Sequence, residues 1–159
     1  MTFLSSDLKP GDILLYRGTG FYSKLIFLKT WHAISHVEVF LGNVNEKRNM
    51  STASRDGQGV AIYPLREDIS YVLRPTLPFN TDAAIEFALK STGTPYGWLD
   101  LIQFCGIDID ANGIVCSPYA TYVQRIAGIP VFRNEKAEKI APSNFLLSEL
   151  YNIIYSPLT

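Results

Sequence analysis

Short apolar segments that alternate with turns fill the first half of the sequence, and this pattern restricts the fold more than any other feature. The turns are marked by proline, glycine and polar residues, beginning with Pro10 and Gly11. The apolar segments lie at 12–17, 35–42, 50–59, 60–65 and 71–75. Because strands joined by short turns pair with their neighbours, the sequence predicts an antiparallel sheet of about five strands.

The second half of the sequence has helical spacing instead. Asn80 is placed to cap a helix that Gly93 ends, and Pro118 suits the first turn of a later helix. The predicted helices lie at 80–93, 96–106, 116–128 and 141–152, with an earlier one at 20–29. A sheet followed by helices, without repeats or linkers, indicates a single α+β domain over residues 1–159.

Charge and composition disfavour several classes of function. The 14 Lys and Arg against 15 Asp and Glu give a net charge of −1. The chain thus lacks the excess positive charge that attracts nucleic acid or an anionic membrane. The N-terminal residues lack the basic start and the apolar run of a secretory signal. No apolar stretch approaches the length of a transmembrane helix. We therefore expect a cytoplasmic protein without a transmembrane segment.

Cys116 has the features of a reactive thiol. It stands where a polar loop runs into a helix, and the free N–H groups and the dipole at a helix N-terminus favour the thiolate. The other cysteine, Cys105, lies within an apolar helical pattern and is expected in the core. Two cysteines at this spacing indicate no disulfide framework.

His36 interrupts an alternating strand and is a candidate base. Val37 and Val39 form the ordinary core face of this strand, so His36 and Glu38 point to the other face. We expect the later helices to cover the His36 face. If the helix that begins at Cys116 packs there, the thiol and the imidazole meet, and this pair performs acyl transfer at neutral pH in many enzymes.

Six segments of the chain together resemble a known family. Their order and spacing are similar to those of the circularly permuted NlpC-type papain-like hydrolases, which include YiiX-like hydrolases and, more distantly, lecithin retinol acyltransferase-like proteins. The resemblance covers residues from about 8 to 150, with the histidine strand before the cysteine helix. The segments are "LKPGDILLYRG", "SHVEVFLG", "ASRDGQGVAIYPL", "GTPYGWLDL", "VCSPYATYVQRIAGI" and "APSNFLLSEL".

This resemblance implies a permuted papain-like fold and a mechanism. The Cys116 thiolate attacks a carbonyl, His36 holds and then delivers the proton, and the backbone N–H of Cys116 stabilises the oxyanion. Tyr96 is expected to line the pocket because the resemblance places its segment near the cysteine helix. Ser54 and Ser117 are expected to contact the substrate as well.

The family adds a third polar residue that orients the imidazole, and here two candidates stand equal. The best match in the next strand is Thr52, where relatives often have His or Glu. A register that places residue 36 opposite residue 52 would bring Thr52 and Ser54 to the His36 face. Glu38, two residues along from His36, is the nearby carboxylate in the same strand. A neutral orienter would support the imidazolium less than a charged one.

No cofactor or metal is expected. A zinc site formed by His32, His36 and Cys116 lacks a clear fourth ligand, and His32 is expected at the rim of the site. The segment 108–113 mimics the start of a calcium loop, but its twelfth position is Tyr119 where a bidentate glutamate is required.

Three functions are consistent with these residues. The first is a cysteine peptidase or amidase that cleaves peptide amides of the peptidoglycan type through a covalent acyl-enzyme. The second is a lipid acyl hydrolase or acyltransferase, because permuted relatives include both. The third is a catalytically degenerate module that binds a ligand in the same cleft. The expected partner is a small peptide or acyl substrate.

Overall fold

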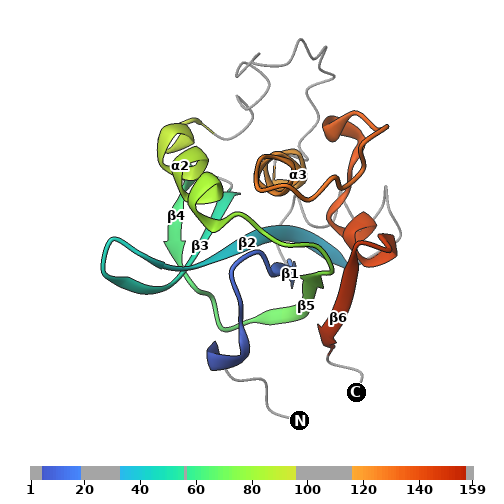
Figure 1. The fold of residues 1–159 in the computed structure, drawn as a ribbon, viewed down its shortest axis with the longest axis horizontal. Coiled ribbons are helices and arrows are strands. Elements are labelled where there is room, and N and C mark those ends of the chain that lie inside the picture. The colour runs from blue at the N-terminus through green and yellow to red at the C-terminus, as the bar shows by residue number, and fades with distance from the viewer. Residues whose placement is uncertain (1–4, 19–32, 56, 96–115, 157–159) are drawn as a thin grey trace.

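The computed structural model describes residues 5–18, 33–55, 57–95 and 116–156, and it shows one sheet with helices on one side (Figure 1). Six strands and two α-helices are accompanied by three short 3-10 helices. In chain order they are η1 (Ser5–Asp7), β1 (Ile13–Arg17), β2 (Ile34–Val44), β3 (Lys47–Arg55), β4 (Gly59–Pro64), β5 (Ile69–Pro75), α2 (Thr81–Ser91), α3 (Cys116–Ile126), η3 (Ala137–Lys139), η4 (Pro142–Leu147) and β6 (Tyr151–Tyr155). This confirms the α+β class.

The sheet is antiparallel throughout, as predicted, but it has six strands in the order β4-β3-β2-β1-β5-β6. The additional strand is β6, which pairs with β5. The sequence predicted one helix over 141–152, and this is wrong in its second half. The helical part is the 3-10 helix η4, whose start is capped by the Asn144 side chain accepting from the Ala141 N–H at 2.6 Å.

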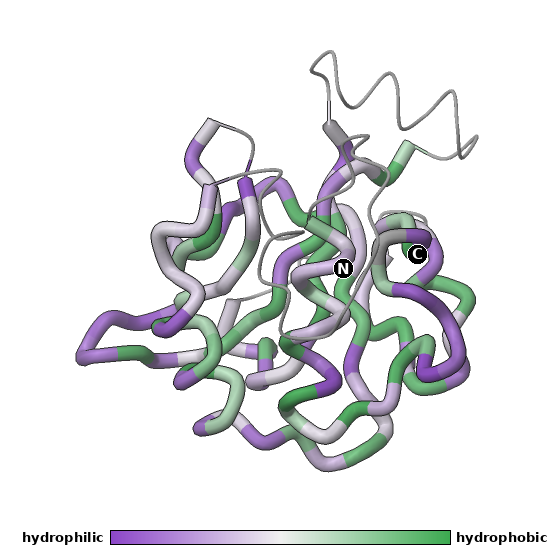
Figure 2. Tube along the Cα trace, turned by 90° about the horizontal axis from the view of Figure 1, so that it is seen from above, coloured by the Kyte–Doolittle hydropathy of each residue, from purple (hydrophilic) through white to green (hydrophobic). Residues whose placement is uncertain are grey.

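The hairpin between β2 and β3 is tighter than the polar segment "GNVNEKRN" at 42–49, which the sequence predicts as a turn, would suggest. Val44 pairs with Lys47, so the loop has two residues. Both of them, Asn45 and Glu46, have positive φ angles of 48° and 67°. Positive φ at both positions is the signature of a type I′ turn, whose twist matches that of the strands. The hydrophilic tip of this hairpin projects from the body of the molecule (Figures 1 and 2).

Helices α2 and α3 cover the face of the sheet that carries Val37 and Val39. The main core lies between these helices and the sheet, and it includes residues of α3 such as Tyr119 and Val123. A smaller core that includes Phe40 forms on the other face. The prediction that these helices cover the His36 face is therefore wrong by strand alternation, because the helices bury the apolar side of β2.

The ends of the two α-helices follow their sequence signals. The Asn80 side chain caps α2 by accepting a hydrogen bond from the Ala83 N–H at 3.1 Å. Gly93 and Gly128 come two residues after the last residues of α2 and α3, with φ of 91° and 94°. This is the left-handed conformation in which glycine commonly ends a helix. The helices predicted at 20–29 and 96–106 lie outside the described residues. Within the described part, none of the helices combines the length and apolarity needed to cross a membrane.

Candidate active site

Cys116 is the first residue of α3, and its sulfur lies against the backbone of β2. The residue is 2% exposed. Its Sγ is 3.9 Å from the Ser35 carbonyl oxygen, and the backbone N–H of Val37 donates a hydrogen bond to it. Pro118 is tolerated in this first turn because the N–H groups there have no partner within the helix.

The sulfur occupies a place where the β2–β3 ladder has ended. The N–H and C=O of Phe40 both bond towards β1, to Asp12 and Gly11 at 2.8 Å. Backbone groups alternate in direction along a strand, so those of Ser35 and Val37 point to the opposite edge. β3 pairs with this edge only from Val39 towards the hairpin. The thiol therefore stands beside the edge of β2 and not over either face.

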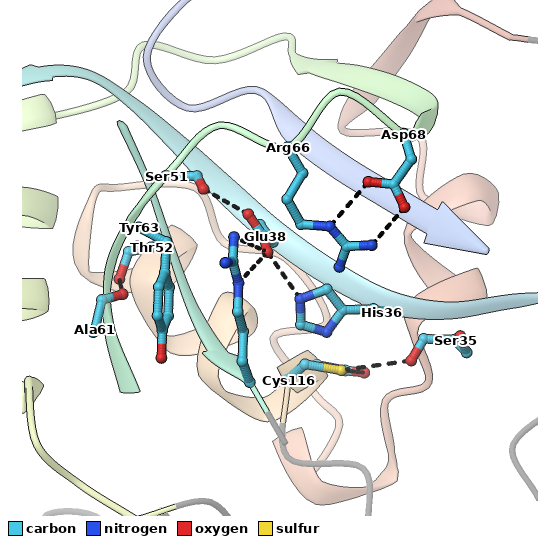
Figure 3. A network of polar contacts seen from close by, with 12 residues as sticks. Ser35, His36, Glu38, Ser51, Thr52, Ala61, Tyr63, Arg66, Asp68 and Cys116 are labelled. Atoms are coloured by element: carbon cyan, nitrogen blue, oxygen red, sulfur yellow. Dashed lines mark hydrogen bonds and ion pairs between the residues drawn. The ribbon is translucent and has the colours of Figure 1, made fainter. Parts of the chain in front are cut away.

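This position explains how His36 meets Cys116 although α3 covers the opposite face of the sheet. A side chain from either face can reach an atom that lies at the strand edge. His36 forms a hydrogen bond with Cys116 and a second one through Nε2 with Glu38 Oε1, at 3.0 Å. Because Nε2 contacts the carboxylate, Nδ1 is the ring nitrogen that faces the sulfur (Figure 3). Sulfur, imidazole and carboxylate thus form one chain.

The geometry favours the charged forms of both His36 and Cys116. Burial alone lowers the pKa of His36, but the hydrogen bonds to Cys116 and Glu38 outweigh it and raise that pKa from 6.5 to about 9. Burial likewise raises the pKa of Cys116, and the hydrogen bond and charge of His36 outweigh it, so the pKa of the thiol is lowered. Both shifts favour the pair of a thiolate and an imidazolium over the neutral thiol and imidazole.

Glu38 is fully buried and is held by three side chains. Its Oε1 accepts from Arg55 Nε at 2.8 Å as well as from His36, and its Oε2 accepts from Ser51 Oγ at 2.5 Å. Burial raises the pKa of this carboxyl, but the hydrogen bond and charge of His36, then the charge of Arg55, lower it overall. Glu38 is thus a carboxylate that is in contact with the imidazole.

Thr52 does not lie beside His36. Residue Val39, and not His36, is opposite Thr52 in the ladder, so Thr52 shares the helix-covered face. Its hydroxyl donates to the Ala61 carbonyl at 3.1 Å and lies 2.7 Å from the Tyr119 hydroxyl. The register that the sequence analysis assumed is therefore incorrect. The two-residue turn sets this register, and the two shifts between Phe40 and Val44 cancel, so Ser51 lies on the His36 face instead.

The expected substrate-contacting serines are both buried. Ser117 Oγ lies 4.0 Å from the Cys116 sulfur. Ser54 lies on β3 two residues after Thr52, and its Oγ is buried without a hydrogen-bond partner. Tyr96, His32 and Cys105 fall outside the described residues. In the part of the chain that the structure describes, no group of three or more His, Cys, Asp or Glu residues could hold a metal ion.

Sequence reasoning missed Ser51 and Arg55. Both lie on β3 with their side chains towards Glu38, and alternation along the strand puts them on one face. The signal was present, because the motif "STASR" spaces a hydroxyl and a cation four residues apart. Only the wrong register concealed it.

The fold and the site together are consistent with a papain-like fold: a cysteine begins a helix, and a histidine of an antiparallel sheet contacts it. No protein-family model matches the chain. The chain is 30% identical over 121 residues to the probable lipoprotein peptidase YaeF of Escherichia coli strain K12. The aligned part is 72% of this chain and 42% of that protein, so the chain spans less than half of its relative's length.

Proposed function

We propose that this protein is a cysteine hydrolase of the peptidase or amidase type, with Cys116 as nucleophile and His36 as acid and base. One observation carries the proposal: the sulfur, the imidazole and the Glu38 carboxylate form a continuous hydrogen-bonded chain. The similarity to a probable peptidase supports the same class of reaction.

The first half of the proposed reaction forms a thioester. The Cys116 thiolate adds to the carbonyl carbon of the substrate amide, and the backbone N–H of Cys116 is placed at the helix start to stabilise the oxyanion. The His36 imidazolium then donates its Nδ1 proton to the leaving amine. The C–N bond breaks, the amine departs, and the acyl group stays on the sulfur.

The second half regenerates the enzyme. Neutral His36 takes a proton from water, and the hydroxide formed adds to the thioester carbonyl. Collapse of this intermediate breaks the C–S bond and releases the carboxylic acid, and the thiolate and the imidazolium are restored. Atoms and charges therefore balance over one cycle, which consumes one water.

Glu38 is proposed to orient the imidazole. It binds Nε2, which leaves Nδ1 directed at the sulfur, and its charge stabilises the imidazolium. The chief support for a non-catalytic binding module was the expectation that the orienting residue lacks a charge. The contact between His36 and a buried carboxylate supports catalysis instead.

The proposed substrates are peptide amides of the peptidoglycan type. This class follows from the family resemblance, and the name of the similar protein supports a peptidase. Lipid acyl groups would use the same thioester chemistry, so they form a separate arm of the test.

The test uses a variant in which Cys105 is replaced by alanine, so that Cys116 is the single thiol. Purified peptidoglycan fragments and, separately, acyl lipids are incubated with this protein and with a Cys116→Ala partner, and products are identified by mass spectrometry. We expect cleaved peptide amides and a trapped acyl mass on Cys116 that hydroxylamine removes. Turnover that survives Cys116→Ala would exclude the mechanism. Products from acyl lipids but not from peptidoglycan fragments would indicate a lipid acyl hydrolase or acyltransferase.

A further inference from the structure

We propose that Arg55 is a positioning residue that fixes Glu38 against His36 and sets the pH range in which Cys116 and His36 react. This inference rests on the proposed function, and it assigns a task to a residue outside the chain of sulfur, imidazole and carboxylate. The contact on which the inference is built is the one that Arg55 makes with the Glu38 carboxylate.

The first argument is that Arg55 and His36 share one oxygen. Arg55 Nε donates to Glu38 Oε1 at 2.8 Å, and a terminal nitrogen of the guanidinium lies 2.8 Å from the same atom. His36 Nε2 is 3.0 Å from it. Ser51 engages the other oxygen, Oε2. The carboxylate oxygen that contacts the imidazole is therefore also paired with the guanidinium of Arg55.

The second argument is that Arg55 is itself held in place. Its guanidinium carbon lies 4.0 Å from the centre of the Tyr63 ring, a cation–π distance. The Tyr63 hydroxyl donates to the Gly59 carbonyl at 2.7 Å, and Gly59 is the residue opposite Arg55 in the β3–β4 pair. The Arg55 side chain is 17% exposed and its guanidinium is stacked against a fixed ring, so Glu38 is bound by a preorganised group.

The third argument follows the charges through the reaction. His36 is a cation when the leaving group departs and is neutral after it has given up its proton. If Arg55 were absent, the fully buried Glu38 carboxylate would then have no cation beside it, and burying an unpaired charge is strongly unfavourable. An arginine side chain is not deprotonated in proteins, so Arg55 compensates the charge of Glu38 at every step of the reaction. Arg55 thereby allows His36 to release its proton.

Other charged or titratable groups around His36 are already compensated or neutral. Arg66 pairs with Asp68 at the surface, with side-chain exposures of 35% and 58%, and stacks over the ring of Tyr16. Burial raises the pKa of Tyr16 and of Tyr63, so both phenols are neutral. The groups that face His36 and Glu38 come from α3, β1, β3, β4 and the β4–β5 segment: Cys116, Tyr16, Arg55, Tyr63, Arg66 and Asp68. Arg55 is the one among them that binds Glu38 as a cation.

The test measures how pH affects alkylation of Cys116 by iodoacetamide in the Cys105→Ala protein. Removing a nearby positive charge raises the pKa of both reacting groups, so in Arg55→Met both limbs of the profile move up by about one pH unit. Alkylation below the lower limb then falls roughly tenfold while the plateau rate is retained. Arg55→Lys keeps the charge but not the planar fork, so its limbs stay in place while turnover of the substrate falls.

The matched control is the double variant Arg66→Met with Asp68→Asn, which removes a neutral pair over a tyrosine and leaves the Arg55–Glu38 contact intact. Its profile should match the parent. If Arg55→Met does not fold, Tyr63→Leu removes the supporting ring and should move the limbs in the same direction by less. Limbs of Arg55→Met, or in its place of Tyr63→Leu, that stay at the parent positions would overturn the proposal. A parent protein without any accelerated alkylation below pH 8 would overturn the proposed function itself, so the two failures are separate.

Discussion

Two buried polar clusters lie on opposite faces of β2 and β3, and adjacent residues of β3 belong to different ones. Ser51 binds Glu38 in the cluster that contacts His36 and Arg55. Thr52, the next residue, binds Tyr119 under the helices. The first cluster is charged and borders the thiol, and the second is neutral and joins the sheet to α3. The comparison shows the effect of strand alternation: of two adjacent residues, one belongs to the proposed catalytic cluster and the other packs the sheet against a helix.

The largest effect is expected from removing the imidazole. In His36→Ala the thiol loses the hydrogen bond and the charge that lower its pKa, so the thiolate is scarce at pH 6. Alkylation of Cys116 at pH 6 and turnover should both fall about a thousandfold. Rates are measured in the Cys105→Ala protein. If the rates stay within a few-fold of the parent, the charged cluster has no special role and the comparison breaks.

The next largest effect is expected from neutralising Glu38. The pKa of His36 is about 9, so turnover should decline above that pH as the imidazolium loses the proton that the leaving group needs. Glu38→Gln removes a charge that raises this pKa, so the upper limb moves to lower pH. Turnover at the optimum falls on the order of a hundredfold, because His36 loses part of its support as an acid and base. An upper limb that stays near pH 9 in this variant would show that Glu38 does not act on the imidazole.

A smaller effect is expected at Ser51. Ser51→Ala removes one donor from Oε2 and leaves both cations on Oε1. The pKa of Glu38 rises slightly as a result, because Ser51 contributes to lowering it. Turnover should fall by less than about tenfold, since a single hydrogen bond to a charged group is lost. A pH–rate profile of this variant checks the result, and a loss as large as that of Glu38→Gln would contradict the division of tasks.

The smallest effect on chemistry is expected at Thr52. Thr52→Val removes the hydroxyl that contacts Tyr119 and Ala61, so the free energy of unfolding should fall by about 1–2 kcal/mol. The rate of Cys116 alkylation and its dependence on pH should stay unchanged. Urea unfolding and the alkylation profile are measured on the same sample. A shifted profile would mean that the two clusters are coupled across the sheet.

Much of the fold was predictable because the signals were local. The turn at Pro10 and Gly11, the Asn80 cap and the start of α3 at Cys116 each depend on a few adjacent residues. β6 was missed because "YNIIY" is a short apolar run that continues the helical spacing before it, and such runs fit either structure. Its pairing with β5 is a contact between distant segments that no local pattern displays.

The candidate site was less predictable because it depends on register. A type I′ turn is usually signalled by glycine, and here Asn45 and Glu46 adopt it without one. The turn pairs Val44 with Lys47, and this register leaves no signature in composition. The expected partner of residue 52 was residue 36 and the observed one is Val39, and an error of this odd size exchanges the two faces of β3. This is why Thr52 stood as a candidate and Arg55 did not.

The place of the sulfur beside the β2 edge has a consequence for how this protein tolerates mutation. Its neighbours there are main-chain groups: the Ser35 carbonyl, which every residue type supplies, and the Val37 N–H, which every type other than proline supplies. The thiol is thus located by peptide geometry, which substitution of the side chains at 35 and 37 does not alter. Replacing Val37 by another apolar residue should leave the Cys116 sulfur in place. Proline at position 37 would remove the N–H that donates to the sulfur.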